Sequence, residues 1–412
     1  MSLSNDEQLY GRAILVRFLS TSAFYLCSAS TAWLVYERTG SALELAALAL
    51  TLFLPMALAT PIIGVSLDTW NRGTILSVSL LVQILIVAGL AVAAYSWAGT
   101  RPLLIGMGSL GLARSLDAAS ISAIEGTISK NLRSMQKAMA ISAFATYASH
   151  IIGPSLAGLL SSLTPTHALV GACTLFGMAG ALAFGLRQMQ TERSAPSSYT
   201  QGIKIALKDR VLAGSILIYS STVFFAGLTG LLPIFAKLVF AVDVSEFGYL
   251  RAAPGVGALA ASLLLIGMPQ IKVPGRMMMG AAILFGMLSM LFSASRDYHV
   301  ALAILVLSGA AINVCLVART SLINVRCPEN VRGGIAALQG LAVAAAYQLG
   351  EVQSTLLAYF VGPTSAAALG GGLCITLCIV AVWWIPELVR FRPIAAPLMV
   401  SSPFKAPRGD SQ

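Results

Sequence analysis

The stretch GVSLDTWNRG, from Gly64 to Gly73, decides the fold of this chain. Long apolar segments stand on both sides of it, Leu45–Leu67 before and Thr74–Trp97 after. A lipid-exposed loop inside the hydrocarbon would leave its backbone groups without hydrogen bonds. A short polar turn that joins two segments of bilayer length therefore belongs at a membrane face.

The composition extends this interpretation to the whole chain. Of the 412 residues, 57% are hydrophobic and 10% are charged, with a mean hydropathy of +0.83. Soluble domains carry about 25% charged residues. Apolar stretches of about 20 residues, long enough to cross a bilayer as helices, recur along the sequence. We predict an all-α membrane protein with about twelve transmembrane helices. The polar start, Met1–Tyr10, predicts no cleavable signal peptide.

The formal net charge of +10 reflects topology and not a nucleic-acid partner. If the apolar stretches cross the membrane in turn, most Lys and Arg residues fall in the connecting segments on one side of it. This asymmetry is typical of cytoplasmic segments and places both termini in the cytoplasm. The basic residues assigned to external loops are Arg38, Arg101, Lys237 and Arg296.

A polar, basic linker divides the apolar segments into two groups of six. We predict an N-terminal six-helix bundle over residues 1–187, a cytoplasmic linker over 188–211, a C-terminal six-helix bundle over 212–386 and a cytoplasmic tail over 387–412. The fourth span should end near Ile124, and the seventh should cover about Leu212–Phe235. Two similar bundles around a midplane site are typical of secondary transporters.

Two motifs resemble those of the major facilitator superfamily. The spacing of Gly64, Asp68 and Arg72 is similar to the loop between helices two and three of that family, although Thr69, Asn71 and Gly73 depart from it. The stretch from Ser149 to Gly158 resembles the Gly-x-x-x-Gly-Pro-x-x-Gly-Gly motif of facilitator antiporters, with departures at Ser149 and Ala157.

Stretches in the second half resemble one bacterial branch of this family. They include Gly248–Ala258, Arg332-Gly333, Gln348–Ser354 and Pro386–Leu388. The branch contains the enterobactin exporter and the macrolide efflux proteins, or transmembrane secretion effectors. The resemblance implies gating roles for a set of motif residues: Gly64, Asp68, Arg72, Gly153, Pro154 and Gly158. Asp68 would cap the cytoplasmic end of helix eleven, whose dipole favours an anion there.

Ionisable residues inside the apolar segments are candidates for proton coupling or substrate binding, because charge at bilayer depth is costly. Arg114 and Asp117 share a helix face, either as a self-neutralising pair or with Asp117 as a proton acceptor. Glu351 has no cation within one turn, so it either cycles a proton or is held by hydrogen bonds. Arg251 and Arg319 are also candidates, and snorkelling toward a membrane surface is the favoured account of both.

These observations favour an exporter over an enzyme or a sensor. No His-Glu-x-x-His, Gly-x-Ser-x-Gly or Walker motif occurs, and the six cysteines form no metal framework. By resemblance, the function is export of a small amphiphilic molecule, a siderophore or a related metabolite or drug, by proton antiport and alternating access. The alternatives are a multidrug or macrolide efflux pump and an importer of a metal chelate. We expect no cofactor and no metal, no nucleic-acid partner, and a monomer in the bacterial cytoplasmic (inner) membrane.

Overall fold

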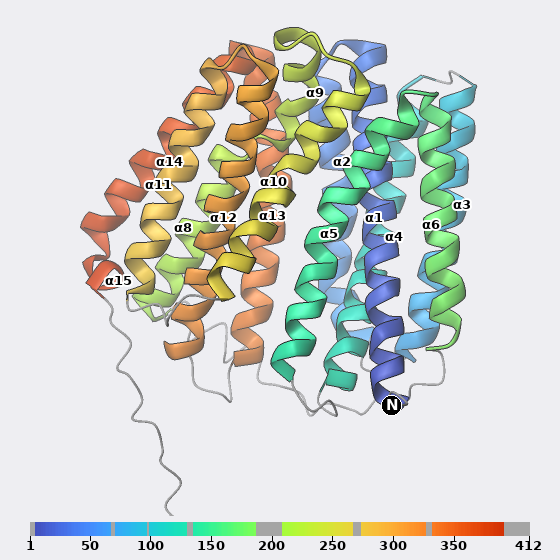
Figure 1. The fold of residues 1–412 in the computed structure, drawn as a ribbon, viewed down its shortest axis with the longest axis horizontal. Helices are drawn as coiled ribbons and strands as arrows, with labels where there is room; N and C mark the ends of the chain where they lie inside the picture. The colour runs from blue at the N-terminus through green and yellow to red at the C-terminus, as the bar shows by residue number, and fades with distance from the viewer. Residues whose placement is uncertain are drawn as a thin grey trace, which may run out of the picture.

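The computed structural model describes residues 5–66, 71–96, 99–129, 135–186, 208–266, 273–326 and 332–390. This part of the chain is helical and contains no strand. The helices run roughly parallel to one another and gather in two groups that stand side by side (Figure 1). We call α1–α6 the N-half and α8–α15 the C-half. The end of the molecule that carries the α1–α2 and α5–α6 turns, opposite the amino terminus, is called the distal end, and the other is the proximal end.

The helices follow one another with short turns. The N-half comprises α1 (Asn5–Thr39), α2 (Ala42–Ser66), α3 (Arg72–Tyr95), α4 (Arg101–Ser129), α5 (Met135–Ser161) and α6 (Pro165–Phe184). The C-half comprises α8 (Arg210–Ala226), η1 (Thr229–Leu231), α9 (Leu232–Ile234), η2 (Phe235–Val239), α10 (Val244–Ile266), α11 (Pro274–Ala294), α12 (Tyr298–Arg326), α13 (Arg332–Val361), α14 (Pro363–Trp384) and α15 (Pro386–Arg390).

Nine helices of the described chain are long and apolar enough to cross a membrane. They are α1, α2, α3, α6, the segment Arg210–Val239, α10, α11, α12 and α14. The long helices α4, α5 and α13 pack against them: α4 lies on α2 and α3, α5 on α1 and α10, and α13 on α2 and α8.

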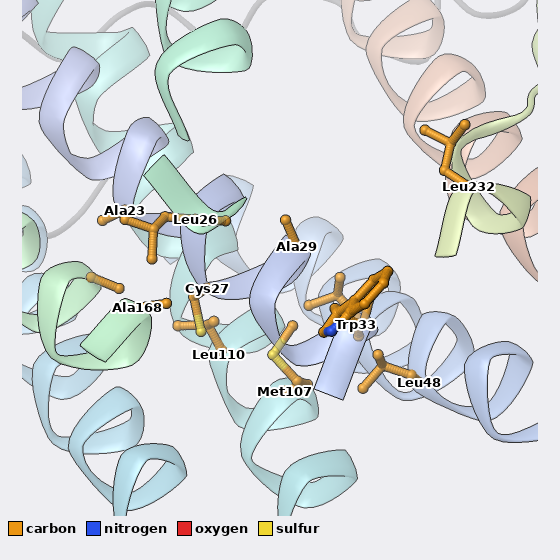
Figure 2. Packing of buried hydrophobic residues seen from close by; sticks show 14 of the residues in the cluster. Ala23, Leu26, Cys27, Ala29, Trp33, Leu48, Met107, Leu110, Ala168 and Leu232 are labelled. Atoms are coloured by element: carbon orange, nitrogen blue, oxygen red, sulfur yellow. The ribbon is translucent and has the colours of Figure 1, made fainter. Parts of the chain in front are cut away.

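Small residues let α1 occupy the centre of the N-half. Its side chains at Ala13, Ala23, Cys27 and Ala29 are fully buried, so neighbouring helices can approach its backbone closely. Helices α4, α5 and α6 all pack on it. Figure 2 shows this packing, in which residues from three elements lie near α1: Leu48 of α2, Met107 and Leu110 of α4 and Ala168 of α6. Leu232 of α9 belongs to the same hydrophobic cluster.

The seventh segment differs from the sequence prediction because its helix is broken. Helix α8 ends at Ala226, and Gly227 has an extended ψ of 122°. A 3-10 turn, one short α-helical turn and a π-helical turn follow. A side chain at Gly227 would meet the backbone oxygen of Val223, and Pro233 has no N–H to donate. The break brings Gly230 against the backbone of Glu351 in α13.

The fourth segment is longer than predicted, because α4 continues past Ile124 to Ser129 and includes Glu125. Most of the predicted linker, and the predicted tail after Arg390, lie outside the described residues. The predicted bundle boundaries therefore remain predictions.

At the proximal end, Asp209 joins two helices of the C-half. Its carboxylate accepts hydrogen bonds from the N–H groups of Val211 and Leu212, which caps α8, and pairs with Arg326 of α12 at 2.7 Å. Burial opposes the charged form of Asp209, but the Arg326 and backbone hydrogen bonds outweigh it and hold the pKa below its ordinary value of 3.8. A depressed folded-state pKa gives stability that is present above the unfolded pKa and is lost as the pH falls.

We therefore expect Asp209→Asn to lower stability at pH 7 and to have less effect in acid. Asparagine still caps a helix, so the substitution removes the ion pair alone. Both side chains are partly exposed, and we expect a loss of about 0.5 kcal/mol. The melting temperatures of variant and parent in detergent should differ at pH 7 and converge below about pH 4. A constant difference across this range would contradict the assignment.

Candidate functional site

Glycines allow the two halves to touch at backbone distance. In the α5–α10 contact, a side chain at Gly158 would lie 2.8 Å from the backbone oxygen of Ser245 and 2.9 Å from Cα of Gly248. Closer to the middle, Gly255 of α10 packs against Ile151 of α5. Gly158 belongs to the antiporter-like motif, and Pro154 lies inside α5 one turn before it.

Polar contacts also join the halves between the distal end and the middle. Arg251 of α10 donates to Ser28 of α1 at 3.3 Å, and the hydroxyl of Tyr147 in α5 donates to Asn313 of α12 at 2.6 Å. Lys237 lies 3.9 Å from Glu37 at the distal surface. Within the described ranges, no hydrogen bond or ion pair joins the halves nearer the proximal end than Tyr147–Asn313.

A small pocket with a volume of about 30 Å³ lies between the halves in the distal part. Its polar lining includes Ser28 of the N-half and Arg251, Glu351 and Thr355 of the C-half. Arg251 interacts electrostatically with Glu351, although the two side chains form no ion pair within 4 Å. Ser354 and Thr355 donate to the backbone oxygen of Glu351 and not to its carboxylate.

Arg114 and Asp117 form an ion pair on α4, as their spacing predicted. Asp117 is 0% exposed and also accepts a hydrogen bond from Gln83 of α3 at 3.4 Å. Arg114 donates in addition to Ser20 and Thr21 of α1, at 3.2 and 2.8 Å. Three helices of the N-half therefore hold the pair, which favours the self-neutralising interpretation.

A second ion pair, which the sequence does not predict, joins Arg17 of α1 to Glu125 of α4 at 2.6 Å. Arg17 also donates to Ser122, and Ser142 of α5 donates to Glu125. Glu125 follows the end predicted for the fourth span, so the sequence places it outside the membrane. An acid at the end of a predicted span is the signal that could have found it.

Arg319 of α12 is buried and does not snorkel, so that interpretation is wrong for this residue. It is 5% exposed, and its guanidinium lies 4.2 Å from the ring centroid of Tyr219 in α8. Tyr347 of α13 lies within electrostatic range of both Tyr219 and Arg319. Nε and Nη1 of Arg319 have no hydrogen-bond partner among the residues that the structure describes.

Aromatic side chains of the N-half face these charges. His150 packs between Tyr25 and Tyr147, with ring centroids 4.4 and 6.2 Å away. Tyr25 lies within electrostatic range of Arg114, Arg251 and Glu351, and both tyrosines lie within range of Tyr347. The candidate residues of the two halves are thus brought around one central interface.

The residues of the opening motif are only partly described. Asp68 lies outside the described residues, and Gly64 is described only as part of the α2 backbone. Arg72 begins α3 and donates to Thr127 of α4 at 3.4 Å. No group of three or more His, Cys, Asp or Glu residues in the described ranges could hold a metal ion.

Comparisons with known proteins agree with this architecture. The sequence profile of the Major Facilitator Superfamily matches residues 13–351. Among curated protein sequences, none matches the chain.

Solved structures with the same fold are distant in sequence. The nucleoside transporter NupG has a TM-score of 0.71 at 11% identity, covering 93% of this chain and 100% of NupG. A bacterial homologue of the human lysosomal transporter Spinster, inward-facing and unoccupied, scores 0.69 at 14% identity, covering 94% and 98%. The human organic anion transporter MFSD10 scores 0.67 at 16% identity, covering 92% and 100%. At such identities, the likeness shows the fold alone.

The close approach at Gly158 generates one prediction. Gly158→Ala should push α5 and α10 apart, because the atoms it would meet are backbone atoms that cannot rotate away. We expect a melting temperature several degrees lower and faster hydrogen exchange at the distal ends of both helices. Gly177→Ala is the matched control, because a side chain there meets nothing within 4 Å. Equal effects of the two substitutions would contradict this account.

The buried Arg114–Asp117 ion pair generates another testable prediction. Asp117→Asn should destabilise the protein by about 3 to 5 kcal/mol, because it leaves the Arg114 charge unpaired. The double substitution Arg114→Gln with Asp117→Asn should regain part of this loss. Thermal unfolding of the two variants and the parent in detergent measures both effects. If the single variant were the more stable of the two, the pair would not be the element that holds α4 in place.

Proposed function

Because the chain belongs to the Major Facilitator Superfamily, we propose that it is a secondary active transporter that exports a small amphiphilic molecule by proton antiport. The family and its structural neighbours indicate a transporter and not an enzyme. The apolar helices and the family together indicate a multi-pass membrane protein. We further propose that transport is export, that it is coupled to protons, and that the substrate is a siderophore or a related metabolite.

The proposed topology has twelve transmembrane helices with both termini in the cytoplasm. It adds α4, α5 and α13 to the nine apolar helices, because each packs along them and is 27 to 30 residues long. The proximal end, where the amino terminus lies, is then cytoplasmic, as the distribution of basic residues suggests. We assign the protein, as a monomer, to the cytoplasmic membrane of a bacterium.

Alternating access is the proposed transport cycle. The contacts described between the halves extend from the distal end to Tyr147–Asn313 in the middle. This distribution fits a state that is closed to the outside. Export requires these contacts to separate, and the opening loop with Asp68 and Arg72 to hold the cytoplasmic side closed in their place. Gly64, Gly153, Pro154 and Gly158 would support this rocking as gating residues.

One observation carries the choice of proton carrier. Glu351 lines the pocket between the halves beside Arg251, and no described side chain forms a hydrogen bond to its carboxylate. Asp117 is instead held by Arg114 and Gln83 within one half. A carboxylate whose surroundings change between the two states can take up and release a proton. We therefore propose Glu351 as the proton carrier and Asp117 as a structural residue.

The fold does not choose the substrate. The neighbours named above are a nucleoside transporter, a lysosomal transporter homologue and an organic anion transporter. The export of a siderophore or related metabolite rests on the sequence resemblance in the second half. Efflux of macrolides or other drugs and import of a metal chelate remain the alternatives.

Glu351→Gln tests the proposed mechanism. In everted membrane vesicles with an imposed pH gradient, we expect this variant to lose at least ten-fold of the gradient-driven accumulation of 2,3-dihydroxybenzoate, used as the probe. Exchange of labelled for unlabelled probe without a gradient should continue, because it needs no change of protonation. Glu387→Gln, a change at an exposed acid of α15, is the matched control. Full gradient-driven accumulation by Glu351→Gln would exclude Glu351 as the carrier.

A further inference from the structure

Among the described residues of the central region, Arg319 is a buried cation whose Nε and Nη1 have no hydrogen-bond partner. Arg114 is paired with Asp117, and Arg251 acts on Glu351 and donates to Ser28. Arg319 is 5% exposed and has no acidic residue within 4 Å in the described parts of the chain, and two of its nitrogens have no partner. Buried charges in proteins are normally paired, so an unpaired guanidinium points to a missing anion.

The surroundings of Arg319 indicate what kind of anion fits. The guanidinium stacks over the Tyr219 ring, and Cys315, Ala318 and Leu322 beside it on α12 are fully buried. A planar guanidinium forms two parallel hydrogen bonds to a carboxylate. One cation in an apolar setting balances a single negative charge, which favours a carboxylate over a phosphate dianion. The tyrosine rings would pack against an aromatic or apolar body.

Tyr347 connects Arg319 to the interface between the halves. Tyr347, which lies within electrostatic range of Tyr219 and Arg319, has 43% of its surface exposed. Tyr25 and Tyr147 of the N-half lie within electrostatic range of it. A ligand between the halves that contacted Tyr347 would therefore lie near the charge of Arg319.

We propose that Arg319, Tyr219 and Tyr347 form the site that binds the carboxylate of an amphiphilic organic anion, the substrate class of this transporter. This inference rests on the proposed function but concerns binding alone. The alternative is a purely structural role, in which Arg319 only forms a cation–π contact with Tyr219. That alternative predicts that removing the guanidinium destabilises the protein. The anion site predicts the opposite in the absence of ligand, because the substitution removes an unpaired buried charge.

The test is thermal unfolding of the full chain in a neutral detergent with salicylate as the probe and salicylamide, its uncharged counterpart, as the control. We expect salicylate to raise the melting temperature of the parent and salicylamide to leave it unchanged. Arg319→Gln should melt at a higher temperature than the parent without ligand and bind salicylate at least ten-fold more weakly. Arg319→Lys should bind with intermediate affinity, because it keeps the charge but loses the paired hydrogen bonds. Arg326→Gln, two turns along the same helix, should bind salicylate as the parent does.

Two further measurements distinguish a carboxylate ligand from inorganic phosphate and from a lipid headgroup. If inorganic phosphate stabilised the parent as well as salicylate does, the carboxylate assignment would be overturned. A stabilisation that appeared only with phosphatidylglycerol in the detergent would assign Arg319 to a lipid headgroup and also overturn it. Equal salicylate binding by Arg319→Gln and the parent would remove Arg319 from the site. No proton gradient is present, so this result is independent of the Glu351 export assay.

Discussion

The constraint on which this structure depends is the cost of placing charge inside a membrane. A charged group at the centre of a bilayer costs at least about 2.5 kcal/mol, so each must find a partner within the protein. The N-half meets this requirement with two ion pairs, Arg17–Glu125 and Arg114–Asp117. Each pair is completed by serine, threonine or glutamine side chains from neighbouring helices. The pairs therefore also fix how α1, α3, α4 and α5 pack together.

The C-half treats its charges differently. Among its described membrane residues, Arg251, Arg319 and Glu351 form no ion pair within 4 Å. Arg251 instead reaches across to Ser28, Glu351 lines the pocket between the halves, and Arg319 rests on an aromatic ring. Charges that are paired within one half keep their partners when the two halves move relative to each other. Charges that depend on the interface change their surroundings whenever the interface opens. The asymmetry thus suggests a rigid N-half and a responsive C-half.

The sequence predicted the parts of this structure that depend on local spacing. Apolar length gave the helices, and the i,i+3 spacing gave the Arg114–Asp117 pair. Local spacing could not predict contacts between residues that are far apart in the chain. Arg17 and Glu125 are 108 residues apart, and Tyr147 and Asn313 are 166 residues apart. Single-helix reasoning also assigned Arg319 to a membrane surface, because it could not know that Tyr219 lies beside it. The break at Gly227 could not be predicted from hydropathy, because one apolar segment, Arg210–Val239, runs through it.

Helix α13 connects the features on which the proposed transport depends. Tyr347 and Glu351 are four residues apart and lie on one face of it, so the tyrosine beside Arg319 and the pocket carboxylate move together. Gly230 places the broken segment against the backbone of Glu351, and α2 of the N-half packs on the same helix. A change in how α2 meets α13 therefore changes the surroundings of both side chains at once. Separating the halves on the distal side cannot leave Glu351 as it is, because the pocket around it is built from both.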